Sequence, residues 1–255
     1  MIANLSIPME SKRQGGDQLV SKVVTTAISA LLRQTELLEV NVRAEPVAKL
    51  LQGSVDGFDC VGQGLLMHSG LQVDQMEFHL QALSIDFGAL FRGQVQLRQP
   101  TQASMRIALT EDNLTESFNT PFLKEKLQQL SWEGQSLMFE RTRISVNEDQ
   151  SLRMQSWVRQ GEAEQLFEID ITARVEVENR RKLKFVEVTY GGDPTAVALG
   201  QMLTEHVNQL LDLDQFALDG MQLRVDQLRL RNKQLTLYGV ALIEKFPQRN
   251  RGWQP

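Results

Sequence analysis

The sequence predicts an α+β fold in which a long, strongly curved antiparallel sheet wraps around a long helix, with a second long helix near the C-terminus. Two stretches have apolar residues at helical spacing, and most of the remaining chain alternates apolar and polar residues as β-strands do. The two kinds of stretch do not alternate as parallel βαβ units would. We place a single domain at residues 17–243, between a flexible lead of residues 1–16 and a tail of residues 244–255.

The two long helices have different start signals. The first is predicted over residues 17–34, where apolar residues from Val20 to Leu32 recur at intervals of three and four and form one stripe. The second begins where Asp193 can cap the helix and Pro194 can take its first position.

Shorter helices are predicted between the strands. Thr110, with Asn113 three residues later, has the spacing of a helix start, and Pro121 begins a second short helix. A further helical turn is predicted after Pro46 and ends at Gly53.

The clearest strand is predicted over residues 167–178, where apolar residues from Phe167 to Val177 occupy odd positions and polar residues occupy even ones. Asn179-Arg180 then forms a tight turn into an antiparallel partner strand at residues 182–190. Further strands are predicted at residues 37–43, 71–87, 103–109, 137–146, 152–158, 223–230 and 235–243.

The strand predicted over residues 71–87 changes phase. Met76 and Phe78 occupy even positions, whereas Leu83 and Ile85 occupy odd ones, which predicts a bulge or bend near Ala82. Such breaks favour a strongly coiled sheet. Because two helices of about 18 residues are each only about 27 Å long, they cannot cover so many long strands. The interior is then either a filled core or an apolar groove that a ligand occupies.

Composition gives little sign of catalysis or nucleic-acid binding. The chain has 27 Lys and Arg against 32 Asp and Glu, a net charge of −5, and no concentrated basic surface for nucleic acid. Its three histidines are scattered, and no HExxH, CxxC or GxSxG motif is present. We therefore expect no enzyme activity, no metal and no cofactor, and we interpret Cys60, between Asp59 and Val61 in a predicted strand, as a small core residue and not a nucleophile.

The first residues have no basic region ahead of an apolar stretch, and no apolar run approaches the roughly 20 residues that span a bilayer. We expect a cytoplasmic protein that can attach peripherally to a membrane.

Several segments together resemble a known family. They are Gly70-Leu71-Gln72-Val73, Ser84-Ile85-Asp86-Phe87-Gly88, Leu90-Phe91-Arg92-Gly93, Thr110-Glu111-Asp112-Asn113-Leu114 and the closing hairpin in residues 221–226, 228–231 and 235–239. Over roughly residues 20–243 the chain resembles the LmeA-like phospholipid-binding family, bacterial relatives of the tubular lipid-binding (TULIP) proteins that include the bactericidal permeability-increasing protein fold. Soluble cyanobacterial members are the nearer match.

The resemblance implies a non-enzymatic protein that binds or transfers phospholipid or glycolipid, with acyl chains held between the curved sheet and the long helix. We predict the groove from the inward phase of the strands; the alternative for each residue is a filled core. The predicted groove residues are Phe78, Leu80, Phe87, Met105, Ile107, Phe139, Met154, Phe167, Ile169 and Ile171.

A headgroup or a transient membrane surface could be met by basic residues around the 167–190 hairpin, namely Arg174, Arg180, Arg181, Lys182 and Lys184. The alternative is a solvated hairpin turn that discourages edge aggregation.

Two other classes of function stay open. A protein-interaction module could use the same fold with a closed core and dock a partner through a strand edge or a helix face. A hydrolase or transferase acting on a lipid ranks below both. The lipid's identity and the oligomeric state, a homodimer included, are left open.

Overall fold

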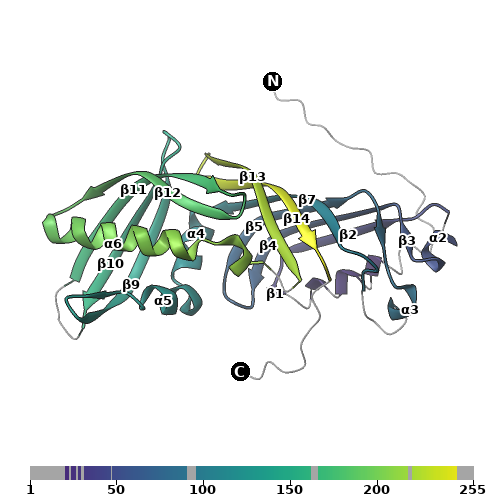
Figure 1. Cartoon of the computed structure of the whole chain (residues 1–255), viewed down its shortest axis with the longest axis horizontal. Coiled ribbons are helices and arrows are strands. Elements are labelled where there is room, and N and C mark those ends of the chain that lie inside the picture. Colours follow the sequence, from purple (N-terminus) through teal and green to yellow (C-terminus); the bar gives the residue numbers. More distant parts are fainter. Residues whose placement is uncertain are drawn as a thin grey trace.

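The computed structural model shows an elongated, mostly antiparallel α+β protein with a curled sheet and few helices (Figure 1). It describes residues 21–22, 24–26, 28–29, 32–46, 48–90, 96–161, 166–217 and 220–245, and for residues 50, 51, 87 and 90 the main chain alone. The predicted lead, residues 1–16, and most of the predicted tail fall outside this part of the chain.

One half of the molecule is a seven-stranded sheet with the order β1-β4-β5-β7-β14-β13, in which β2 also pairs with β4 (Figure 1). Its strands are β1 (Leu32–Gln34), β2 (Leu37–Arg43), β4 (Gly57–Met67), β5 (Gln72–Leu80), β7 (Thr101–Thr110), β13 (Met221–Arg231) and β14 (Gln234–Ile243). Every pairing is antiparallel.

The other half is a five-stranded sheet in which consecutive strands are neighbours, in the order β12-β11-β10-β9-β8. Its strands are β8 (Ser131–Trp132), β9 (Gln135–Val146), β10 (Leu152–Gln160), β11 (Leu166–Glu178) and β12 (Lys182–Gly191). A separate small pair joins β3 (Ser54–Val55) to β6 (Leu83–Ser84).

The helices begin where the sequence predicts. α4 (Glu111–Phe118) has a capping box between Thr110 and Asn113, and α5 (Pro121–Leu127) begins with its proline. In α6 (Pro194–Leu210), the Asp193 carboxylate accepts a hydrogen bond from the Ala196 main-chain N–H at 2.9 Å. The remaining elements are α2 (Ala48–Leu51), α3 (Phe87–Leu90) and the 3₁₀ turn η1 (Leu213–Gln215). Within the described residues, no helix combines the length and apolarity needed to cross a bilayer.

The first predicted helix is shorter than expected. The described residues between 21 and 29 are helical, and Val24 and Ile28 pack into the core. The helix does not reach residue 34, because Leu32–Gln34 is β1 and pairs with β4.

The sequence predicted one sheet, but the strands divide between two. After β7 the chain forms α4 and α5, builds the five-stranded sheet as a meander, and passes through α6 before it returns (Figure 1). The C-terminal hairpin then joins the first sheet, with Gln234 of β14 opposite Thr110 of β7. Pairing over so long a separation leaves no local pattern from which to infer it.

The predicted strand over residues 71–87 is likewise two elements. β5 ends at Leu80, and the chain then leaves the sheet so that Leu83 pairs with Val55 of β3. The phase change near Ala82 therefore marks the end of a strand, where we predicted a bulge within one.

The five-stranded sheet is covered by α6, which packs on β11 and β12. Leu199, Leu203 and Val207 of the helix are at most 1% exposed. Gly200 allows the close approach, because a Cβ atom there would lie 2.8 Å from the Tyr190 ring. The side of α6 that faces β11 and β12 is therefore buried.

The two sheets meet at the turn between β11 and β12. The main-chain N–H of Val225 in β13 donates to the Arg180 carbonyl oxygen at 2.7 Å, and the Arg180 guanidinium pairs with Asp226 at 2.8 Å. Asn179 and Arg180 both have left-handed backbone, with φ of 52° and 59°, as the predicted tight turn requires.

Candidate functional site

The two faces of the seven-stranded sheet differ in chemistry. Residues that are directly opposite across neighbouring strands share a face, so Cys60, Phe78 and Met105 lie on one side of the sheet. Asp59 and His79, one position earlier on β4 and one later on β5, form a row on the other side. One face is therefore apolar and the other polar.

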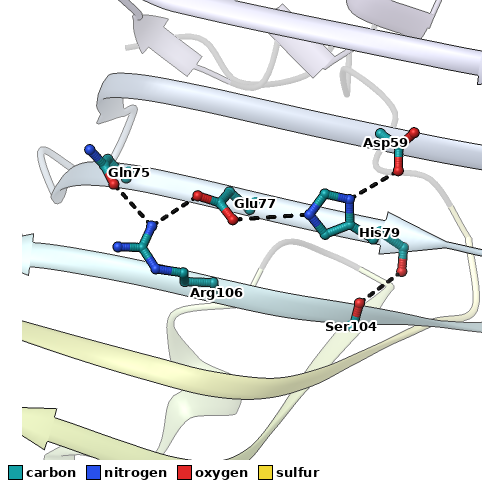
Figure 2. Close-up of polar contacts among 6 residues, drawn as sticks. All are labelled: Asp59, Gln75, Glu77, His79, Ser104 and Arg106. Carbon is teal, nitrogen blue, oxygen red and sulfur yellow. Dashed lines mark hydrogen bonds and ion pairs between the residues drawn. The ribbon is translucent and has the colours of Figure 1, made fainter. Parts of the chain in front are cut away.

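The polar face carries a network of hydrogen bonds and ion pairs across three strands (Figure 2). Its members are Asp59, Gln75, Glu77, His79, Ser104 and Arg106. His79 Nδ1 lies 2.9 Å from Asp59 and its Nε2 lies 4.0 Å from Glu77, while Arg106 contacts both Glu77 and Gln75 at 2.9 Å. These charges are partly exposed, and such surface pairs contribute at most about 1 kcal/mol each.

The network does not assemble a nucleophile next to its histidine. The Ser104 hydroxyl donates to the main-chain oxygen of His79 at 3.2 Å, so it is directed at the backbone and not at the imidazole ring (Figure 2). Across the described ranges, no group of three His, Cys, Asp or Glu residues is arranged to hold a metal ion. What the geometry does show is a set of cross-strand contacts that fix the register of β4, β5 and β7.

The apolar face holds a cluster of half-buried side chains in two adjacent rows, which we call the apolar patch: Leu38, Val40, Met76, Phe78 and Ile107. Met76 lies opposite Ile107, and the next row places Phe78 between Cys60 and Met105. These side chains pack against the buried core, and Cys60, Leu80 and Met105 beside them are buried.

Two glycines of β4 shape this face. A Cβ atom at Gly62 would lie 2.9 Å from the Leu65 side chain, so Leu65 occupies the space above it. Gly64 has left-handed backbone, with φ of +57°, and it lies between Gln63 and Leu65, which pair with Gln75 and Val73 of β5.

The structure divides the predicted groove residues between the two sheets. On the seven-stranded sheet, Phe78 and Ile107 are half-buried, while Leu80 and Met105 are buried. Phe87 begins α3, and its side chain is outside the described part of the structure. The second group lies on the five-stranded sheet: Phe139, Met154, Ile169 and Ile171, all at most 3% exposed, and half-buried Phe167.

The second group belongs to the core beneath α6. Met154 of β10 is opposite Ile171 of β11, and both are packed into the hydrophobic core.

The predicted basic residues are largely balanced by carboxylates. Arg180 pairs with Asp226, Arg181 lies 3.1 Å from Asp212, and Lys184 lies 3.4 Å from Glu178. Arg174 pairs with Glu187 at 3.1 Å. The main chain of Lys182 forms an isolated antiparallel β-bridge with that of Asp212. Local pairing reduces the positive field that a membrane surface would meet.

Cys60 lies in the core, 1% exposed, and burial raises the pKa of its thiol to about 12. At pH 8 only about one thiol in ten thousand would then be ionised. We expect iodoacetamide to leave the native protein unmodified at pH 8 and to alkylate it completely in denaturant, as intact-mass measurement would show. Rapid labelling of the folded protein would contradict this placement.

Sequence reasoning missed Leu38, Val40 and Met76 as members of the site. Leu38 and Val40 alternate with polar residues within a predicted strand, and Met76 occupies an even position together with Phe78. The alternation of apolar residues therefore marks all three as inward-facing. What placed them together was the pairing of β2 and β5 on either side of β4, where the prediction was a strand at Cys60 without bounds or partners.

Comparison with known proteins gives one family. A family model described as LmeA-like phospholipid-binding matches residues 12–240, most of the 255-residue chain. The search of curated proteins and the search of solved structures gave no match to the chain.

Proposed function

Because the chain belongs to the LmeA-like phospholipid-binding family, we propose that it binds a phospholipid and holds the acyl chains against the apolar patch of the seven-stranded sheet. The observation that carries this proposal is the patch itself, in which five large apolar side chains are only half-buried beside a buried core. A soluble protein gains nothing from such exposure unless a ligand covers it.

The energetics explain why a continuous apolar surface is needed. Each methylene that leaves a bilayer for water costs about 0.8 kcal/mol. Moving about 30 methylenes without a substitute apolar environment therefore costs on the order of 25 kcal/mol, which the binding surface has to offset. Met76 suits this task because its flexible side chain adapts to different chains.

The helical residues between 21 and 29 provide a second wall. The main-chain N–H of Val42 in β2 donates to the Ser21 hydroxyl at 3.0 Å, and Val24 packs into the core. This places the helix beside the strand that carries Leu38 and Val40. In our proposal the acyl chains lie between this helix and the sheet, and the protein carries lipid through water with transient membrane contact.

The alternative of docking a protein partner through a strand edge receives less support. The main-chain N–H of Phe185 on the outer edge of β12 donates to the Asn208 side chain at 2.7 Å, and that of Leu183 donates to the Leu211 carbonyl at 2.9 Å. These contacts occupy groups that an added strand would need.

Native mass spectrometry of protein purified without detergent tests the proposal. We expect a population heavier by the mass of one phospholipid, which organic extraction releases and lipid analysis identifies. If the protein carries no lipid and also takes up none from mixed phospholipid vesicles, the proposal fails.

A further inference from the structure

A cleft of about 380 Å³ lies where β13 of the seven-stranded sheet meets β11 and the turn between β9 and β10. Its polar lining includes Asp149, Arg174 and Glu176, and its apolar lining includes Val175, Leu228 and Leu230. This volume is within the range of sites that hold small molecules.

The charges on the cleft are mixed in sign. Asp149 is fixed as a carboxylate acceptor, because the Ser151 hydroxyl and main-chain N–H donate to it at 2.6 and 3.0 Å. These hydrogen bonds lower the pKa of the Asp149 carboxyl. Arg174 and Glu176 project from the same side of β11, two positions apart. The lining itself therefore contains one guanidinium and two carboxylates, and Lys184 of β12 lies directly opposite Glu176.

Arg174 keeps donors for a ligand. Its ion pair with Glu187 uses Nε at 3.1 Å, and a guanidinium has four more N–H donors on its terminal nitrogens. A planar guanidinium matches a phosphate group well. The carboxylates of Asp149 and Glu176 would repel a ligand that carries only negative charge. They would attract an ammonium group next to the phosphate.

The floor of the cleft belongs to the apolar face described above. Leu228 is opposite Leu237 of β14, which is opposite Ile107 of the apolar patch. At about 4.8 Å between strands, Leu228 lies two strands or about 10 Å from Ile107. The cleft and the patch are thus near enough to meet parts of one amphipathic molecule.

We propose that this cleft binds a zwitterionic group made of a phosphate and an ammonium, with Arg174 facing the phosphate and Asp149 and Glu176 facing the ammonium. The group can come from a phosphatidylethanolamine headgroup or from free glycerophosphoethanolamine. The lipid form of the inference rests on the proposed function; recognition of the free group does not.

The full-length protein would be incubated with vesicles that contain equal amounts of phosphatidylethanolamine and phosphatidylglycerol with the same acyl chains, and bound lipid would be counted by native mass spectrometry. We expect a preference for phosphatidylethanolamine of roughly fivefold, the ratio given by about 1 kcal/mol from a surface charge pair. Glu176→Gln combined with Asp149→Asn should abolish that preference, and Arg174→Gln should lower the loading of both lipids.

Matched controls are Glu168→Gln, about 26 Å from Glu176 along β11 at 3.3 Å per residue, and Arg143→Gln on β9; neither residue lines the cleft. Both should keep the wild-type preference. Equal loading of the two lipids by the wild type, or a preference that survives the cleft variants, overturns the inference and leaves lipid binding intact. Failure to load either lipid counts against the proposed function.

Calorimetric titration with glycerophosphoethanolamine and with glycerol 3-phosphate separates the two sources. Binding of glycerophosphoethanolamine alone, lost in Glu176→Gln with Asp149→Asn, supports recognition of the free group. A lipid preference without soluble binding supports the headgroup as the source. Equal affinity for both soluble compounds, or neither soluble binding nor lipid preference, overturns the inference.

Discussion

Replacing Phe78 by glutamate is expected to reduce bound phospholipid at least tenfold. Phe78 is the half-buried centre of the apolar patch, between Cys60 and Met105. Covering a carboxylate with hydrocarbon costs several kcal/mol, and each 1.4 kcal/mol is a factor of ten in affinity. Native mass spectrometry of variant and wild type, purified side by side without detergent, measures the change.

Val240→Glu provides the matched control. Val240 is also half-buried in the seven-stranded sheet, but it lies opposite Ser104 on the polar face. The same charge there should leave lipid occupancy unchanged. Phe78→Leu, which keeps the site apolar, should retain lipid, and a second polar substitution, Ile107→Gln, should reduce it if Phe78→Glu does not fold. Full occupancy in every variant would exclude the patch as the acyl-chain site.

Leu203→Ala is expected to lower the free energy of unfolding by about 2–5 kcal/mol, the range for truncating a buried leucine. Leu203 is 1% exposed on the face of α6 that covers the five-stranded sheet. Urea denaturation followed by circular dichroism measures the difference. Gln201→Ala, on the exposed side of the same helix, should change stability by no more than about 0.5 kcal/mol.

The same variant separates the two groups of predicted groove residues. If the residues under α6 are core only, Leu203→Ala should keep normal lipid occupancy at temperatures where it remains folded. Loss of lipid under those conditions would mean that the acyl chains extend into the five-stranded sheet, as the sequence-based groove prediction included.

Local signals account for the elements that were predicted well. Asp193 with Pro194, and Thr110 with Asn113, act within one helical turn, so the sequence alone locates α6 and α4. Strands such as β11 alternate regularly over their whole length. By contrast, β4 contains Gly57, Gly62 and Gly64, which interrupt the apolar alternation, so the strand predicted at Cys60 had no predicted bounds.

Non-local pairing explains what the sequence did not show about the site. Alternation assigns a residue to one side of its own strand, but it does not tell which strands are neighbours or which sheet a helix covers. Ile107 and Ile171 have the same kind of pattern, yet one is half-buried on β7 and the other is sealed under α6. The cleft at Arg174 joins segments from β11 and β13, which no local pattern brings together.

The return of the C-terminal hairpin to β7 also sets an order of events during synthesis. The five-stranded sheet and α6 use residues 131–210 only, so they are complete on the ribosome before the hairpin emerges. Until residues 221–243 follow, the edge of β7 that pairs with β14 has unpaired main-chain N–H and C=O groups. In that interval the edge of β7 is a site at which another chain can pair, which is a route to aggregation.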